Sequence, residues 1–227
     1  MSSGRRIALL DLDGTLTDPR DGILRCLRAA FAAVDRPAPP ERELLGWIGP
    51  PLAASFEAAL GCPEAAGEAL RAYRACFDES GWRANRPVAG IDTALTDLAD
   101  GGFDCYVATS KPLVFARRIV SHFRLDRWIS DVFGSEFDGT RADKAELIAH
   151  ALGELDAPAA STVMVGDRHH DAAGAEACAV PCVGVLWGFG DRGELEAAGA
   201  IAIAVHPGQL AEACLDALFN ARRATAR

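Results

Sequence analysis

Two carboxylates stand two positions apart at the end of an apolar run. In the stretch RIALLDLDG, Asp11 directly follows the run and Asp13 precedes Gly14. Such neighbouring carboxylates repel each other unless a cation lies between them, and Mg²⁺ binds carboxylate, carbonyl and water oxygens together with a substrate phosphate. One carboxylate can also attack phosphorus while the other protonates the leaving oxygen. The pattern therefore indicates phosphoryl chemistry, although a polar turn or a helix cap uses the same residue types.

Polar residues also follow two later apolar runs. Thr109 and Ser110 lie between the run CYVA and a predicted helix, and Asp167 and Asp171 follow the run TVMVG. Hydroxyls and free backbone amides at the start of a helix bind phosphate, although helix caps use the same residues. If the runs are parallel strands, all of these groups face one edge of a sheet.

Lysine is rare in this chain. Only Lys111 and Lys144 are lysines among the 23 lysines and arginines. Arginine cannot imitate a compact ammonium on a flexible stem, so both lysines are candidates for a specific role rather than for a general surface charge. Lys144 also falls near the start of a predicted helix, where a positive charge opposes the helix dipole. That placement is tolerable if Lys144 neutralises phosphate and carboxylates.

Short, unbroken apolar runs alternate with segments of helical spacing. The runs cover residues 7–10, 105–109, 162–166 and 181–185, and the helical segments cover 92–100, 112–122, 143–155 and 171–179. Unbroken runs are typical of strands buried on both faces, and the alternation predicts an α/β fold with a doubly wound, Rossmann-like parallel sheet. Ligands of such folds bind outside the carboxyl ends of the strands, where the strand order reverses.

The first two predicted strands are separated by more than 90 residues of mainly helical pattern. This segment is too long for an ordinary crossover. We therefore predict a small inserted α-helical cap at residues 17–86 and a core of residues 1–16 and 87–227. The joining stretches TDPRDG and NRPVAG contain the proline and glycine expected of hinges. Trp47 falls in the cap, where it either stacks on a substrate base or fills a helical core.

Charge and composition limit the partners. The formal net charge of −9 argues against a nucleic acid or an anionic membrane as the main partner, and no apolar run approaches the length of a membrane span. The apolar stretch after the two N-terminal arginines is far shorter than a signal-peptide core, so we predict a cytoplasmic protein. The seven cysteines contain no CxxC pair and fit free, buried thiols in a reducing compartment. Nothing in the sequence argues for a particular oligomeric state.

The ordered set of motifs DLDGT, TS, Lys144 and GDRHHD resembles the four motifs of the haloacid-dehalogenase-like phosphatases. The resemblance spans nearly the whole chain, including the early helical cap. It implies that Asp11 is the nucleophile and a Mg²⁺ ligand, and that Asp13 is the acid and base and binds Mg²⁺ through its carbonyl. Thr109 and Lys144 then bind the phosphoryl group, and Asp167 completes the metal shell with support from Asp171.

We expect further substrate contacts from six residues of these motifs, the cap and the loop before Lys144: Gly14, Thr15, Ser110, Lys111, Arg141 and Trp47. The forms WIGPP, ATSKP and FDGTRADK most resemble bacterial nucleoside 5′-monophosphate phosphatases, with phosphoglycolate phosphatases close behind. Either substrate is a small phosphorylated metabolite. Phosphoglycolate would favour a cap arginine near the phosphate, such as Arg20, Arg42 or Arg83.

Three other activities occur among proteins with similar motifs. Asp13 argues against carbon–halogen cleavage, which has no use for a leaving-group acid, and a cap without lysine argues against a phosphonate hydrolase. A phosphosugar mutase shares every core residue and stays open. A catalytically idle binding module also stays open, although such a module would not need Asp13.

Overall fold

The computed structural model describes residues 5–225, and its centre is a six-stranded parallel sheet. The strand order is β5-β4-β1-β6-β7-β8, so the chain builds outward from β1 first on one side and then on the other. The strands are β1 (Arg6–Leu10), β4 (Phe103–Pro112), β5 (Ile129–Ser135), β6 (Thr162–Gly166), β7 (Cys182–Val185) and β8 (Ala202–Ala204). The strand order reverses around β1, which is where a doubly wound fold binds its ligands.

Helices cover both faces of the sheet, which confirms the predicted fold class. Side chains alternate along β1, so that Ala8 and Leu10 pack into one buried cluster while Ile7 and Leu9 pack into the other. This alternation explains why the run is apolar throughout. The first cluster lies under α5 (Ile91–Asp100), α6 (Leu113–His122) and α10 (Leu210–Thr225), and the second lies under α7 (Lys144–Glu154) and α8 (His169–Ala177). A short helix, α9 (Arg192–Ala197), follows β7.

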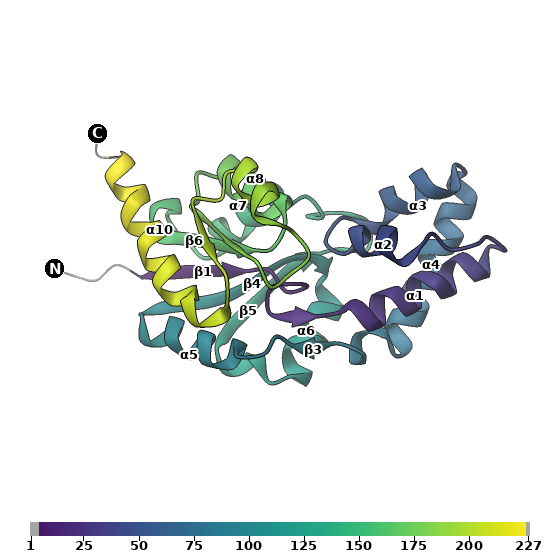
Figure 1. The fold of residues 1–227 in the computed structure, drawn as a ribbon, viewed down its shortest axis with the longest axis horizontal. Coiled ribbons are helices and arrows are strands. Elements are labelled where there is room, and N and C mark those ends of the chain that lie inside the picture. Colours follow the sequence, from purple (N-terminus) through teal and green to yellow (C-terminus); the bar gives the residue numbers. More distant parts are fainter. Residues whose placement is uncertain (1–4, 226–227) are drawn as a thin grey trace.

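Residues 20–83, between β1 and β4, form a helical lobe beside the sheet, whereas α5 of the same interval packs on the sheet (Figure 1). Its helices are α1 (Arg20–Ala33), α2 (Glu41–Leu44), α3 (Leu52–Leu60) and α4 (Pro63–Glu79), with α1 packed against α4. The two chain segments that join the lobe to the core pair as short antiparallel strands, β2 (Thr17–Asp18) and β3 (Arg86–Pro87). The predicted cap boundaries at residues 17 and 86 fall in this pair, while residues 1 and 227 lie outside the described range.

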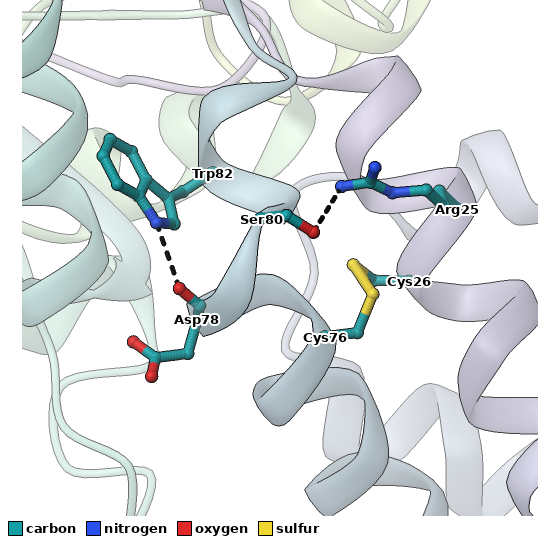
Figure 2. The surroundings of a disulfide bond; sticks show 6 residues. All are labelled: Arg25, Cys26, Cys76, Asp78, Ser80 and Trp82. Atoms are coloured by element: carbon teal, nitrogen blue, oxygen red, sulfur yellow. Dashed lines mark hydrogen bonds between the residues drawn. A yellow bond between two sulfur atoms is a disulfide. The ribbon is translucent and has the colours of Figure 1, made fainter.

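The prediction that all cysteines are free, buried thiols was wrong. Cys26 of α1 and Cys76 of α4 form a disulfide with a Cα–Cα distance of 5.5 Å (Figure 2). The bond lies near the end of α4, where Arg25 also donates a hydrogen bond to Ser80 over 2.9 Å. Fifty residues separate the two cysteines, and only the packing of α1 on α4 brings them together.

Five cysteines are free, but Cys62 is exposed and Cys178 is only half-buried. The disulfide removes the thiol argument for a reducing compartment, so the cytoplasmic location stays a prediction. Within residues 5–225, no helix is both long and apolar enough to cross a membrane.

Candidate active site

Two neighbouring carboxylates leave the carboxyl end of β1 and meet two different lysines. Lys144 Nζ lies 2.8 Å from Asp11 Oδ1, and Lys111 Nζ lies 2.6 Å from Asp13 Oδ2. All four side chains are less than a tenth exposed. Lys144 begins α7, and its ammonium also donates to the Ala108 carbonyl over 3.1 Å. The two rare lysines are therefore ion-paired within one buried cluster.

The glycines of the motifs make room for carboxylates from other strands. Gly14 turns the chain with φ +86°, and a Cβ there would lie 2.3 Å from Asp167 Oδ2. A Cβ on Gly166 would lie 2.1 Å from Asp171 Cγ. A larger residue at either position would push the Asp167 or Asp171 carboxylate away from the carboxylates that follow β1.

Fixed donors orient the carboxylates that follow β6. Asp167 accepts hydrogen bonds from the Phe189 amide over 2.7 Å and from the Thr15 hydroxyl over 3.5 Å. Asp171, in the first turn of α8, accepts from the Arg168 amide over 3.1 Å, and its other oxygen lies 2.7 Å from Lys144 Nζ.

Three of these carboxylates could hold a cation. Ligand atoms of Asp11, Asp167 and Asp171 all lie within 4.8 Å of one another, and all three residues are buried. Counted with Asp13, four carboxylates face two lysines, so the fully ionised cluster carries two negative charges in excess. An all-oxygen donor set with this excess fits Mg²⁺.

Burial and mutual repulsion govern the protonation of the cluster. Burial raises the pKa of Asp13, although Lys111 opposes the shift. Burial also raises the pKa of Asp171 to about 6, against the opposing effect of Lys144. The pKa of Asp167 rises well above its usual range, first through burial and then through Asp171 and Asp11. Burial alone would lower the pKa of Lys144, but Asp11 and Asp171 outweigh it and raise that pKa.

A cavity of about 330 Å³ opens above the cluster, between the core and the helical lobe. Its lining includes most of the predicted site residues, namely Asp11, Asp13, Thr109, Ser110, Lys111, Lys144, Asp171 and Trp47. Gly14, Thr15 and Asp167 are outside the lining, and all three contribute to the packing around the Asp167 carboxylate beneath it. The cavity therefore lies over the residues for which the sequence predicts phosphoryl chemistry.

Two predicted substrate contacts lie differently from their expected roles. Arg141 forms an ion pair with Glu136 and is outside the cavity lining. Trp47 reaches the cavity, but its ring also packs against Phe31 and Phe56, with centroids 5.8 and 5.3 Å away. It therefore serves the aromatic core of the lobe in addition to the cavity wall.

Sequence reasoning missed three cavity residues. Arg168 donates to the Ile48 carbonyl over 2.8 Å and so joins the core to the lobe, while Arg74 of α4 donates to the Phe137 carbonyl over 2.7 Å. Arg168 was visible in the motif GDRHHD and Phe137 in the stretch FDGTRADK, although neither was given a role. The sequence carried no signal for Arg74, whose role depends on how the lobe meets the core.

Comparison with known proteins agrees with this geometry. Residues 8–185 match the family model described as haloacid dehalogenase-like hydrolase. The chain is 47% identical over 190 residues to a 5′-nucleotidase of Pseudomonas aeruginosa, covering 83% of this chain and 86% of that protein. It is 28% identical over 200 residues to a plasmid phosphoglycolate phosphatase of Cupriavidus necator, covering 86% of this chain and 87% of that protein.

A relative with a different name is also similar. The chain is 40% identical over 185 residues to the tyrosine-protein kinase PtkA of Mycobacterium tuberculosis, which covers 82% of this chain but 63% of that protein. Among solved structures, a predicted phosphatase from Clostridium acetobutylicum superposes with a TM-score of 0.88 at 35% identity, covering 93% of this chain and 99% of that one. Together with the motif geometry, these matches show that the chain belongs to the haloacid dehalogenase-like hydrolase family and is a phosphoric monoester hydrolase.

Proposed function

We propose that this protein is a Mg²⁺-dependent phosphatase that hydrolyses a small phosphomonoester, with a nucleoside 5′-monophosphate as the favoured substrate. One observation carries the proposal. Asp11 and Asp13 line the same cavity but pair with different lysines. Of the two, only Asp11 belongs to the group of carboxylates that could hold a cation together with Asp167 and Asp171. Two adjacent carboxylates thus have environments suited to two roles, nucleophile and acid.

The proposed reaction uses these roles in two steps. An Asp11 oxygen bonds to phosphorus while the ester P–O bond breaks and Asp13 gives its proton to the leaving oxygen. Asp13 then takes a proton from water, whose oxygen attacks the phosphorus of the aspartyl phosphate and frees phosphate and Asp11. The raised pKa of Asp13 favours the protonated form that the first step requires.

Other residues bind and orient the transferring group. Lys144 and the Thr109 hydroxyl line the cavity beside Asp11 and are suited to hold the phosphoryl oxygens. Asp11, Asp167 and Asp171 would bind Mg²⁺, with the Asp13 carbonyl as a further ligand by family resemblance. When bound, the ion neutralises charge on the phosphoryl oxygens.

The composition of the cavity lining favours a nucleoside rather than glycolate as the leaving group. Its lining is rich in aromatic side chains, including Trp47, Tyr73, Phe77 and Phe115. Phosphoglycolate would instead need a cation for its carboxylate, and Arg20, Arg42 and Arg83 are outside the lining. The two arginines of the lining have protein partners, since Arg74 donates to the Phe137 carbonyl and Arg168 is ion-paired with Glu194. The 5′-nucleotidase relative supports the same choice.

The test is phosphate release by the purified protein, with Mg²⁺ and with chelator. We expect Mg²⁺-dependent hydrolysis, with a higher kcat/KM for nucleoside monophosphates than for phosphoglycolate or sugar phosphates. Preference for phosphoglycolate would overturn the substrate assignment. Interconversion of sugar phosphate isomers without phosphate release would favour a mutase.

Metal binding should depend on pH in a defined direction. Because the folded-state pKa values of Asp167 and Asp171 are raised, the metal-free folded protein binds protons more tightly than the unfolded chain. Its stability should therefore fall as pH rises from about 4 to about 6, the value reached by Asp171. Mg²⁺ needs the ionised carboxylates, so its stabilisation should grow over the same interval.

Calorimetry measures this effect directly. At matched ionic strength, the Tm gain from Mg²⁺ should be small near about pH 5 and larger near about pH 8. Asp167→Asn should lose most of the gain at the higher pH. An equal gain at both pH values would contradict the assignment of this cluster to the metal.

A further inference from the structure

A row of aromatic rings leads from the predicted leaving-group acid to an exposed part of the cavity. Lys111 Nζ, which contacts Asp13, lies 4.4 Å from the centroid of the Phe77 ring. Phe77 meets Phe115 at 5.0 Å between centroids, and Phe115 meets Phe137 at 5.5 Å. All of these residues line the same cavity. A leaving group that extends from Asp13 in the direction of this row reaches Phe137, the exposed ring at its end.

Phe137 ends the row and differs from its neighbours in exposure. It is 45% exposed, whereas Phe77 is 1% and Phe115 is 3% exposed. It lies just beyond β5, in the core, at the first position of the stretch FDGTRADK, where the sequence analysis expected Arg141 rather than Phe137 to contact substrate. A large exposed ring at a cavity wall leaves aromatic surface free for a ligand.

Arg74 holds Phe137 in place from the helical lobe. Its guanidinium lies 4.8 Å from the centroid of the Phe137 ring and donates to the Phe137 carbonyl over 2.7 Å. The ring is thus held by the Arg74 guanidinium and by the edge-to-face contact with Phe115. Fixing a ring before binding lowers the entropy cost of stacking on it.

The charges near Phe137 do not suit an anionic leaving group. Glu136 and Asp138 flank it and also line the cavity, with Glu136 ion-paired to Arg141. The Arg74 guanidinium, which lies over the ring, already donates to the Phe137 carbonyl. Arg168, another cationic side chain of the lining, is already ion-paired with Glu194 and hydrogen-bonded to Ile48. A neutral aromatic ring with hydrogen-bond donors fits these surroundings better than a carboxylate or a second phosphate.

We propose that Phe137 is a specificity-determining residue that stacks on the aromatic ring of the leaving group, with Arg74 as its positioning residue. This inference rests on the proposed phosphatase function and adds the part of the site that selects a nucleobase. It predicts that the Phe137 ring, which belongs to the core domain, determines selectivity for aromatic leaving groups. Arg74 of the helical lobe holds that ring in position.

The experiment compares kcat/KM for adenosine 5′-monophosphate with kcat/KM for ribose 5-phosphate, which lacks the base. In Phe137→Leu, which keeps apolar bulk without an aromatic face, the ratio of the two values should fall by at least about 5-fold, the lower end expected for one base–aromatic stack. Phe137→Tyr should keep the ratio. Arg74→Met should lower it by a smaller factor.

Phe219→Ala is the matched control. Phe219 is also an exposed ring, 59% exposed, with the Arg223 guanidinium 5.5 Å from its centroid, but it lies on α10 away from the lobe (Figure 1). The ratio of the two kcat/KM values in Phe219→Ala should equal that of the wild type.

Three outcomes would overturn the inference. Equal losses on both substrates in Phe137→Leu would mean that the ring only docks the lobe on the core. A wild type that hydrolyses ribose 5-phosphate as well as the nucleotide would remove aromatic selectivity while leaving the phosphatase function intact. A wild type that hydrolyses no phosphomonoester would overturn both.

Discussion

Asp11→Asn is expected to abolish phosphatase turnover, with a loss of roughly four orders of magnitude or more, as when other enzymes lose their nucleophile. The amide is nearly isosteric with the carboxylate and can still accept a hydrogen bond from Lys144, but it is a very poor nucleophile. Steady-state phosphate release with Mg²⁺ measures the loss, and circular dichroism checks the fold.

Stability separates this result from misfolding. Asp11 is one of the charges that raise the pKa values of Asp167 and Asp171, so its removal relieves repulsion. Lys144 loses one ion pair but keeps the other, with Asp171 at 2.7 Å, so its charge does not stay uncompensated. The metal-free variant should therefore have a Tm no lower than that of the wild type. Asp126→Asn, at a solvent-exposed position on the α/β core domain, is the matched control and should change neither turnover nor Tm. Normal turnover by Asp11→Asn would refute the nucleophile assignment.

Lys144→Met should lose both activity and stability. The Lys144 side chain is 5% exposed and pairs with Asp11 and Asp171 within 2.8 Å, so its removal leaves two buried carboxylates without their cation. Breaking a buried pair in this way costs about 3–5 kcal/mol. Loss of a donor to the phosphoryl oxygens should lower kcat by about a hundredfold to a thousandfold.

Urea unfolding measures the change in stability. Mg²⁺ should restore part of it in Lys144→Met, because the ion would neutralise the same carboxylates. Arg192→Met, which removes an exposed ion pair with Glu196, should have little effect. Unchanged stability of metal-free Lys144→Met would show that Lys144 does not neutralise this cluster.

The proposed catalytic residues at the base of the cavity could be predicted from sequence because they lie at or near the carboxyl ends of strands. The runs before Asp11, Thr109 and Asp167 became β1, β4 and β6, which are adjacent in the sheet. Parallel strands bring their carboxyl ends to one edge, so the order of motifs along the chain was enough to gather these side chains.

Two strands and the cap contacts could not be predicted in the same way. Asp131 interrupts the apolar pattern of β5, and β8 has three residues, so the two edge strands carry weak signals. The disulfide and the Arg74–Phe137 contact each join residues far apart in sequence, through the packing of helices or of the lobe on the core. Sequence spacing holds no information on such packing, which is why Arg20, Arg42 and Arg83 were considered and Arg74 was not.

Covalent capture of the phosphoryl group on Asp11 tests the central claim most directly. An aryl phosphate needs little protonation of its leaving oxygen, whereas hydrolysis of the aspartyl phosphate needs Asp13 as a base. In rapid-quench experiments, Asp13→Asn should therefore release aryl alcohol in a burst stoichiometric with active sites. Peptide mapping of the acid-quenched protein should then find phosphate on Asp11. Steady turnover of the aryl phosphate with no covalent phosphate, or with phosphate on another residue, would contradict the account.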